Sequence, residues 1–352
     1  MPPVPTKIVI IGTGLIGPRH AQAVLREPMA ELSCIVDPNP AAQKVAQDLG
    51  TAWYNSTKEM LASGCRPVAA IVCTPNHTHV SVSKELLDAG IHVLVEKPIS
   101  GDAESAQSLI QYAKDKKLVL LVGHHRRFNP YIVATKKFLQ AGNIGSITAI
   151  SGLWTICKPS PYFEAPMEWH RSSSSGGPIM INLIHEIDIL HYLLGPITRV
   201  FAEKTMSRRC FEAEEGAAIV LRFESGIVGT FLLSDNTPSP HNFEAGTGEN
   251  PMIPKVGKDV YRIFGTEGMV SIPDMKWSRY DGVNSWAEEI KEIEVEVDMG
   301  KAPFELQVKH LVEVLAGRED PVCSGADGLR AVVVCEAVKK ALDTGMPVEI
   351  QA

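Results

Sequence analysis

The stretch that decides the fold is KIVIIGTGLIG at residues 7–17. It opens on a continuous apolar run, as expected of a strand that is buried on both faces of a sheet. Gly12, Gly14 and Gly17 then fit the pattern GxGxxG, between this strand and a helix that we expect at Arg19–Arg26. The first glycine permits a tight turn, the second lets a pyrophosphate approach the backbone, and the third lets helix and strand pack closely. The stretch therefore predicts a dinucleotide-binding βαβ unit.

The same alternation of apolar runs and amphipathic segments continues outward to His125. Repeated strand, helix and strand predict a Rossmann domain at residues 1–125, with a doubly wound parallel sheet. The predicted strands are Lys7–Ile11, Leu32–Val36, Val68–Cys73, His92–Val95 and Leu118–Val122, and the predicted helices are Arg19–Arg26, Ala41–Leu49, Val80–Ala89 and Ala103–Asp115.

The pattern changes after residue 125, where a second domain at residues 126–352 is predicted. Alternating strands and a hairpin at Glu224-Ser225-Gly226 indicate an α+β domain with a large, mostly antiparallel open sheet. Its closing helices, within residues 305–344, are candidates to pack back on the first domain. The Pro- and Gly-rich segment Asn236–Lys258 is predicted to be a mobile or contact loop. The other predicted elements are helices at Tyr131–Ala141, Ile179–Leu194, Glu305–Leu315 and Ala326–Thr344 and strands at Ser146–Ile156, Arg199–Met206, Ala217–Glu224, Ile227–Ser234, Val260–Phe264 and Glu292–Val297.

Length and composition limit the class of protein. A chain of 352 residues exceeds what one core usually organises, which agrees with two domains. The net charge of −7 argues against nucleic acid as the main partner. No apolar run is long enough to span a membrane, and the seven cysteines contain no CxxC pair. We therefore expect a cytoplasmic protein without a metal site, a membrane anchor or disulfides.

Asp37 ends the second predicted strand, 20 residues after Gly17. At this position a carboxylate can accept hydrogen bonds from the ribose hydroxyls of a dinucleotide. It would repel a 2′-phosphate, and no Arg or Lys stands beside it in residues 37–40. The sequence therefore favours NAD over NADP as the cofactor, with NADP as the alternative.

Two further polar stretches end predicted strands of the parallel sheet. One is residues 73–79, CTPNHTH, and the other is residues 95–98, VEKP. Ligands of this fold bind at the carboxyl edge of the sheet, where both stretches lie. Lys97 suits a buried strand end only if it has a ligand or an ion pair.

Together with the glycine turn and Asp37, these stretches and RRFNP at residues 126–130 resemble the Gfo/Idh/MocA oxidoreductases. The resemblance covers essentially the whole chain, including Gly176-Gly177 and the segment Ile184–Asp188. It implies a Rossmann domain followed by a domain whose open sheet supports the active site and commonly an oligomer interface. Homodimers or homotetramers formed through that sheet are therefore expected.

The resemblance also implies the chemistry. Family members mostly oxidise a hydroxyl or reduce a carbonyl on sugars, cyclitols and related polyhydroxy compounds. The lysine of their Glu-Lys-Pro element lies beside the nicotinamide, and that role maps onto Lys97. The histidine that acts as general acid/base maps onto His185. An imidazole suits this task because it titrates near neutral pH, and an ammonium stabilises developing alkoxide charge.

One position departs from the family pattern. Many members carry an aspartate four residues before this histidine, where this chain has Ile181. Asn182 and Asp188, each three residues from His185 on the predicted helix, are the candidate replacements. Asp188 keeps a carboxylate near the ring and is the better one.

The sequence thus predicts a catalytic set, a cofactor set and a substrate set. The catalytic set is Lys97, His185 and Asp188. The cofactor set is Gly12, Thr13, Gly14, Leu15, Ile16, Gly17, Asp37, Cys73, Thr74, Pro75, Asn76, His79, Glu96, Lys97, Pro98 and Arg126. The substrate set is Lys97, His125, Lys158, Trp169, Arg171, Asn182 and His185, and inward-pointing Lys158 and Arg171 would indicate a substrate with a carboxylate or many acceptors.

The leading functional prediction is an NAD(P)-dependent dehydrogenase acting on CH–OH groups of a small polyhydroxy substrate. Two alternatives stay open at this point. One is a redox-neutral epimerase or hydrolase with tightly bound NAD, and the other is a dinucleotide-binding regulator without catalysis, which the Ile181 substitution motivates.

Overall fold

The computed structural model describes residues 4–173 and 175–351. The chain divides into two compact units. The first unit runs to Asn129 and takes in Gly300–Val332, and the second comprises Pro130–Met299 and continues from Val333. Each unit is built on one sheet.

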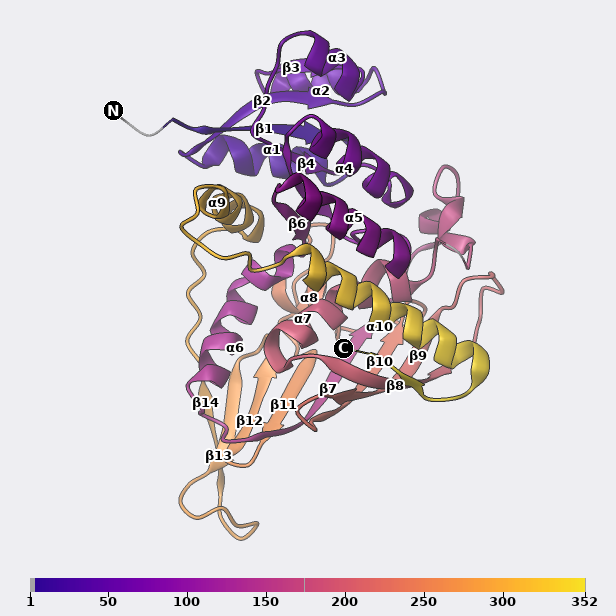
Figure 1. The fold of residues 1–352 in the computed structure, drawn as a ribbon. Helices are drawn as coiled ribbons and strands as arrows, with labels where there is room; N and C mark the ends of the chain where they lie inside the picture. Colours follow the sequence, from indigo (N-terminus) through magenta and orange to yellow (C-terminus); the bar gives the residue numbers. More distant parts are fainter. Residues whose placement is uncertain (1–3, 174, 352) are drawn as a thin grey trace. The chain divides into compact units, whose positions relative to one another are not determined.

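The first unit contains six parallel strands in the order β3-β2-β1-β4-β5-β6 (Figure 1). This is the strand order of a doubly wound dinucleotide-binding fold, whose switch point lies between β1 and β4. The predicted Rossmann sheet is therefore confirmed. The elements are β1 (Thr6–Ile11), α1 (Gly17–Arg26), β2 (Ala30–Val36), α2 (Ala42–Asp48), β3 (Ala52–Tyr54), α3 (Thr57–Ala62), β4 (Ala69–Val72), α4 (His79–Asp88), β5 (His92–Glu96), α5 (Ala103–Lys116) and β6 (Leu120–Gly123).

A helix from the far end of the chain completes this unit. Helix α9 (Pro303–Leu315) packs on α1, and Arg26 pairs with Glu305 at 2.7 Å. Val308 and Leu311 of α9 belong to the same buried cluster as Ile8 of β1. The first unit therefore draws part of its core from residues 300 onward.

The second unit contains nine strands in the order β14-β13-β12-β11-β7-β10-β9-β8-β15. Strands β7 and β10 pair in parallel and the other named pairs are antiparallel, which confirms the predicted mostly antiparallel sheet. The elements are α6 (Pro130–Gln140), β7 (Ile147–Thr155), α7 (Ile184–Leu194), β8 (Ile197–Lys204), β9 (Gly216–Phe223), β10 (Val228–Ser234), α8 (Phe243–Thr247), β11 (Tyr261–Gly265), β12 (Gly268–Ile272), β13 (Lys276–Tyr280), β14 (Ile290–Glu294), the later part of α10 (Gly325–Thr344) and β15 (Val348–Glu349).

The segment Asn236–Lys258 is only partly a loop. Asn242 caps helix α8 by accepting a hydrogen bond from the backbone N–H of Ala245 at 2.9 Å, and all five helix residues are buried. The prediction of a mobile or contact loop is therefore wrong for Phe243–Thr247, which are helical. Gly246 and Gly248, which suggested a loop, instead allow close packing and a left-handed helix end.

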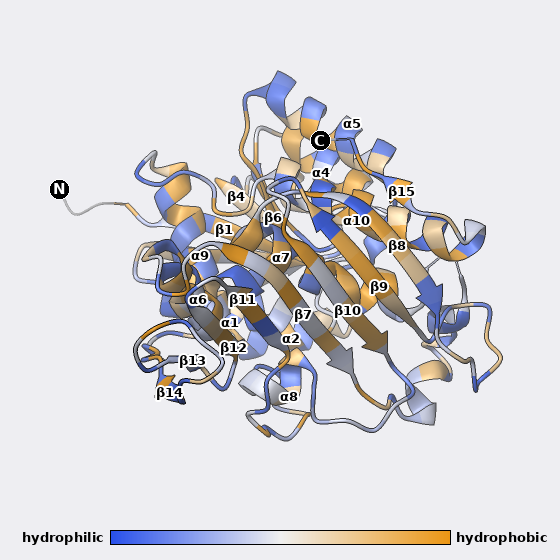
Figure 2. Ribbon diagram, turned by 90° about the horizontal axis from the view of Figure 1, so that it is seen from below, coloured by the Kyte–Doolittle hydropathy of each residue, from blue (hydrophilic) through white to orange (hydrophobic). Residues whose placement is uncertain are grey.

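One face of the second sheet carries exposed apolar residues. Val220 of β9 and Val228 and Leu232 of β10 are 50%, 43% and 40% exposed. They share a face because Val220 lies opposite Thr230 and Leu232 lies opposite Ala218 in the antiparallel pair. Figure 2 shows both strands largely in the colours of hydrophobic residues.

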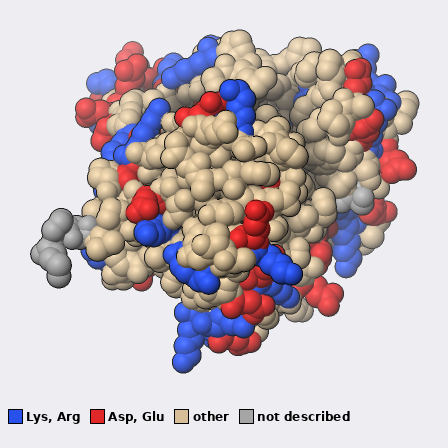
Figure 3. All heavy atoms as spheres, turned by 90° about the horizontal axis from the view of Figure 1, so that it is seen from above, with Lys and Arg blue, Asp and Glu red and all other residues tan. Residues whose placement is uncertain are grey.

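Acidic and basic side chains are mixed on the face that Figure 3 shows, and neither sign covers it alone. Within residues 4–173 and 175–351, no helix is long and apolar enough to cross a membrane.

Candidate active site

The glycine turn follows β1 at the switch point of the first sheet. A Cβ atom on Gly12, whose φ is +96°, would lie 2.7 Å from the carbonyl oxygen of Cys73, and one on Gly17 would lie 2.1 Å from that of Gly12. Neither position has room for a side chain. Gly14, in contrast, faces open space, and Leu15 beside it is 83% exposed. The turn is closed toward the sheet and open outward at the start of α1, which fits a bound pyrophosphate.

Asp37 is held against this turn. Its Oδ2 accepts hydrogen bonds from the backbone N–H and the hydroxyl of Thr13, at 2.7 and 2.6 Å, and its Oδ1 accepts one from the N–H of Asn39 at 2.8 Å. The carboxylate is thus fixed at the carboxyl ends of β1 and β2. The structure brings together the two features, glycine turn and aspartate, from which the sequence predicted the ribose site.

The loops that follow β4 and β5 are joined by His79. Its Nδ1 lies 2.7 Å from the carbonyl oxygen of Pro98, and its Nε2 lies 2.9 Å from that of Thr74. Burial lowers the pKa of His79, so at neutral pH the ring donates to one of the two carbonyl groups at a time. His79 is buried and positions these loops.

Glu96 forms a buried pair with His20 of α1. Its Oε1 lies 2.7 Å from Nε2 of His20, and its Oε2 accepts a hydrogen bond from the backbone N–H of Lys97 at 3.2 Å. Burial alone would raise the pKa of Glu96, but the hydrogen bond with His20 and the nearby His125 and Lys97 lower it to about 2. His20 was not predicted from the sequence as a site residue. Its signal is its place three residues after Gly17, on the first turn of α1.

The loop after β6 brings two histidines to the same edge. The ring of His125 stacks on Phe304 of α9 with centroids 4.5 Å apart, and Phe304 also contacts His20 edge-on at 4.9 Å. His124 is fully buried, and burial, followed by the charges of Arg127 and Lys97, lowers its pKa well below the usual value. His124 is therefore neutral at physiological pH.

The remaining predicted cofactor residues lie on these same loops. Burial raises the pKa of the Cys73 thiol, with Glu96 adding to the effect, so Cys73 stays a neutral thiol. Lys97 is half-buried at the end of β5, and Arg126 is buried in a short 3-10 turn. The others are Ile16, directly before α1, and Pro75 and Asn76, exposed at the start of a 3-10 turn that leads into α4.

In the second unit, His185 and Asp188 lie on α7 and are both buried. The segment just before them is not the predicted α-helix. Residues Ile179–Leu183 form a π-helical turn, in which the N–H of Ile184 bonds to the carbonyl of Ile179. The wider turn changes the relative directions of side chains three residues apart, so the α-helical spacing used for Asn182 and His185 does not hold. Single π turns of this kind are frequent at functional sites.

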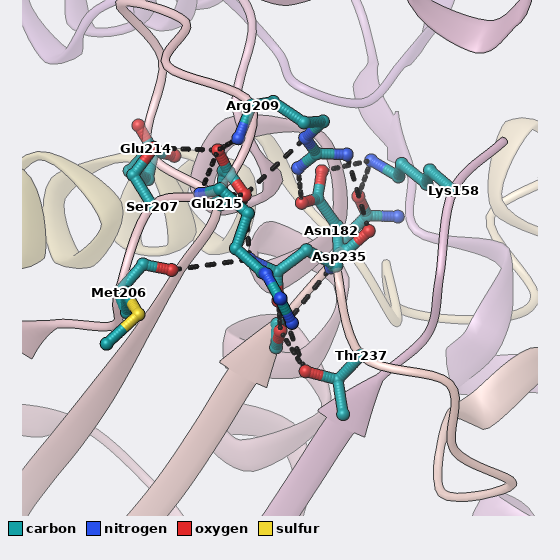
Figure 4. A network of polar contacts seen from close by, with 12 residues as sticks. Lys158, Asn182, Met206, Ser207, Arg209, Glu214, Glu215, Asp235 and Thr237 are labelled. Carbon is teal, nitrogen blue, oxygen red and sulfur yellow. Dashed lines mark hydrogen bonds and ion pairs between the residues drawn. The ribbon is translucent and has the colours of Figure 1, made fainter. Parts of the chain in front are cut away.

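Asn182 on this turn bonds to Lys158 (Figure 4). The Nζ of Lys158 donates to Oδ1 of Asn182 at 2.8 Å, lies 3.5 Å from Oδ2 of Asp235, and lies 4.5 Å from the centroid of the Tyr162 ring. Burial lowers the pKa of Lys158 to about 8, although Asp235 opposes the shift. Lys158 and Asn182 were each predicted from the sequence to bind substrate, and the structure places the two side chains in contact.

A second cation and a second carboxylate complete this cluster. Arg209 bonds to Asp235 and lies 3.5 Å from Glu215. Glu215 also accepts hydrogen bonds from the backbone N–H of Arg209 and from the Asn236 amide, both at 2.7 Å. Burial raises the pKa of Glu215, but these hydrogen bonds and one from Ser207 lower it to about 2. Arg209, Glu215 and Asp235 were not predicted from the sequence, although Asp235 directly follows strand β10, as Asp37 directly follows β2.

Trp169 and Arg171 lie on a short 3-10 turn close to this cluster. Trp169 is 40% exposed and contacts His170, whose ring stacks on Tyr162 with centroids 3.9 Å apart. The guanidinium of Arg171 lies over the ring of Phe211 at 5.0 Å. Lys158 and Arg171 therefore have different partners: Asp235 balances the charge of Lys158, and Arg171 lies over the Phe211 ring.

Comparison with protein families agrees with both units. Residues 6–124 match the model of an oxidoreductase family with an NAD-binding Rossmann fold, and residues 136–350 match that of the same family's C-terminal alpha/beta domain. The chain belongs to the Gfo/Idh/MocA oxidoreductase family. The predicted family is confirmed, and with it the NAD cofactor and the enzyme class.

Relatives match either nearly the full length of this Gfo/Idh/MocA protein or about half of it. It is 26% identical over 355 residues to scyllo-inositol 2-dehydrogenase (NAD(+)) of Bacillus subtilis, which covers 98% of this chain and 96% of the relative. It is 29% identical over 206 residues to levoglucosan dehydrogenase of Pseudarthrobacter phenanthrenivorans, covering 55% and 52%. Its fold matches the WlbA dehydrogenase of Bordetella pertussis, solved with NADH and UDP-GlcNAcA, with a TM-score of 0.79, 23% identity and 99% of each chain covered.

Proposed function

We propose that this oxidoreductase transfers hydride between NAD and a CH–OH group of a sugar, cyclitol or related polyhydroxy compound. The observation that carries the proposal is the fixed carboxylate of Asp37 beside a glycine turn that is open outward. The relatives support the substrate class, since the scyllo-inositol and levoglucosan dehydrogenases are named for polyhydroxy substrates.

NAD rather than NADP is the proposed cofactor. Asp37 would accept a hydrogen bond from a hydroxyl group of the adenosine ribose, and its negative charge would repel a 2′-phosphate. Thr13 fixes the orientation of the carboxylate by two short hydrogen bonds, so it cannot turn away to make room for a phosphate without losing both. The glycine turn and the start of α1 would hold the pyrophosphate, with the loops after β4, β5 and β6 along the rest of the cofactor.

Lys97 and His185 are the proposed catalytic residues. Bound NAD supplies the hydride acceptor. Lys97 would donate to the substrate oxygen and stabilise the negative charge that develops on it, and the imidazole of His185 would take the hydroxyl proton as the C–H bond breaks. Asp188, buried one turn after His185, would favour the protonated imidazole that this transfer produces.

The substrate proposed is neutral and rich in hydroxyl groups. Lys158 and Arg209 are balanced by Asp235 and Glu215, so the cluster has no spare positive charge for a substrate carboxylate. Because Asn182 accepts from Lys158 through Oδ1, its amide N–H groups remain as donors for a hydroxyl oxygen. Trp169 offers an exposed apolar face, which suits stacking against a sugar ring.

We also infer that the exposed apolar face of the second sheet pairs with another copy of the chain, as a homodimer or homotetramer. Val220, Val228 and Leu232 on one sheet face form the kind of apolar surface that self-association covers. A cytoplasmic location fits the seven cysteines, which are all free thiols.

The test is NADH formation by the purified protein with cyclitols, anhydrosugars and aldoses, offered with NAD and with NADP. At saturating NAD the Lys97→Met variant should lose turnover by roughly 10²-fold or more, whereas Lys44→Met, at a side chain that is 81% exposed, should match the unchanged protein. Turnover that survives in Lys97→Met would rule out the proposed role of this lysine.

A further inference from the structure

Two thiols lie close together in the first unit, outside the residues proposed to bind cofactor or substrate. Sγ of Cys34 is 3.8 Å from Sγ of Cys65. Cys34 is fully buried in strand β2, and Cys65 is half-buried in the turn between α3 and β4. We propose that Cys34 and Cys65 are a redox modification site, which a hydroperoxide oxidises to a reversible intramolecular disulfide.

The geometry requires a small movement of one partner. A disulfide has an S–S distance of about 2.05 Å, so the two sulfur atoms must approach by somewhat under 2 Å. Cys34 cannot supply the movement, because its strand is paired on both sides, with Val9 of β1 and Ala52 of β3. Cys65 lies outside any strand or helix, and its N–H makes only a long hydrogen bond, 3.4 Å, to Oγ of Ser63. The turn at Cys65 is therefore the part that moves.

The different exposure of the two thiols sets the order of the chemistry. Cys65 can reach a hydroperoxide, and its thiolate sulfur attacks the O–O bond, which gives Cys65 sulfenic acid and releases an alcohol, or water when the oxidant is hydrogen peroxide. The sulfur of Cys34 then attacks the sulfenic sulfur, the S–S bond forms, and water leaves with the thiol proton. The two thiols lose two electrons, which reduce the peroxide.

Cys34 is protected from attacking the oxidant first. Burial, with the neighbouring Cys65 adding to the effect, raises the pKa of the Cys34 thiol far above its usual value. The sulfenic sulfur on Cys65 forms next to Cys34, since the two sulfur atoms are already 3.8 Å apart. Proximity therefore makes Cys34 the thiol that resolves the sulfenic acid.

The turn that moves is linked to the proposed ribose site, and this step rests on the proposed function. Ser63 donates a hydrogen bond to the Tyr54 hydroxyl at 2.9 Å, and the carbonyl of Tyr54 accepts from the N–H of Asp37 at 3.1 Å. Cys34 itself lies in β2, three residues before Asp37, which directly follows that strand. Closing the disulfide should therefore disturb Asp37 and weaken the binding of NAD.

Hydrogen peroxide is the probe. The full-length protein is oxidised, its remaining thiols are alkylated, and linked peptides are mapped by mass spectrometry. We expect a Cys34–Cys65 linkage that dithiothreitol reverses, absent from Cys34→Ser and Cys65→Ser and retained in Cys157→Ser, which removes an exposed cysteine elsewhere. A protein in which Cys65 is oxidised to sulfinic acid equally with and without Cys34, or in which no linkage forms, overturns the proposal.

NAD titrations of the same samples separate this inference from the proposed function. We expect the Kd for NAD to rise several-fold on oxidation of the unchanged protein and to stay constant in Cys65→Ser. Linkage without any change in Kd would overturn the connection to Asp37. A reduced protein that does not bind NAD at all would instead contradict the proposed function, while peptide mapping would still decide the disulfide.

Discussion

Replacing Asp37 by alanine tests the proposed choice of cofactor. The carboxylate binds chain donors through both oxygens, with Thr13 on Oδ2 and Asn39 on Oδ1. Asp37→Ala removes an acceptor for the adenosine ribose and a negative charge that would face a 2′-phosphate. We expect weaker binding of NAD and stronger binding of NADP.

The size of the effect follows from the acceptor sites that are left. A carboxylate has about four lone-pair sites. Three are used by the two donors of Thr13 and the N–H of Asn39, which leaves about one for the ribose. A hydrogen bond to a charged group contributes about 1.5–3 kcal/mol, so the Kd for NAD should rise about 10- to 150-fold. The Kd for NADP should fall, because the repulsion is removed.

Calorimetric titration with each cofactor measures both constants. Asp37→Asn keeps the shape and one acceptor oxygen but loses the charge, so it should lose less affinity for NAD and gain affinity for NADP. Asp48→Asn, at an aspartate 67% exposed on the same unit, is the matched control. If the Kd values for NAD and NADP change by the same factor, so that their ratio stays constant, Asp37 does not select between the two cofactors.

Three further predictions concern single side chains. Glu96→Gln should make the stability of the fold less dependent on acid pH. The pKa of Glu96 is lowered from 4.5 to about 2, so its ionised form stabilises the fold above pH 4.5, and this stabilisation, roughly 3 kcal/mol, is lost as pH falls through about 2. Urea unfolding between these pH values measures the effect, and the same loss of stability in the variant as in the unchanged protein contradicts it. His185→Gln should lower kcat about 10²- to 10⁴-fold and leave the Kd for NAD unchanged, as stopped-flow and titration would show; full activity would exclude His185 as the acid/base. Lys158→Met should raise KM for the substrate about tenfold or more. In the unchanged protein KM should rise as Lys158 loses its proton near pH 8, and this rise should be absent from the variant. A KM equal to that of the unchanged protein would place Lys158 outside the substrate site.

The parallel sheet and its strand ends could be predicted from the sequence because their signals are local. Gly12, Gly17 and Asp37 stand at fixed spacings within one βαβ unit, and buried parallel strands are continuous apolar runs. Strand β3 could not be found in this way, because it has three residues and none of them is fully buried. Short, half-exposed strands have no periodic pattern to detect.

The polar partners of the site could not be predicted, because tertiary structure creates them. His20 and Glu96 are 76 residues apart in the chain and meet only when α1 packs beside the end of β5. Asp235 is recognisable as a residue that follows a strand, but its pairing with Lys158 depends on the register of β10 against β7, and its pairing with Arg209 on the register of β10 against β9. The π turn before His185 has the same apolar periodicity as an α-helix, so the sequence predicted a helix there and misaligned Asn182 with His185.

Hydride transfer between NAD and a CH–OH group requires that each hydroxyl oxidised yields one free NADH. The most direct measurement is the ratio of NADH released to carbonyl product formed, over many turnovers with a polyhydroxy substrate that the purified protein accepts. We predict one NADH for each carbonyl product, with both yields limited by added NAD. Conversion of substrate by bound NAD without release of NADH would instead identify a redox-neutral enzyme and exclude the proposed dehydrogenase.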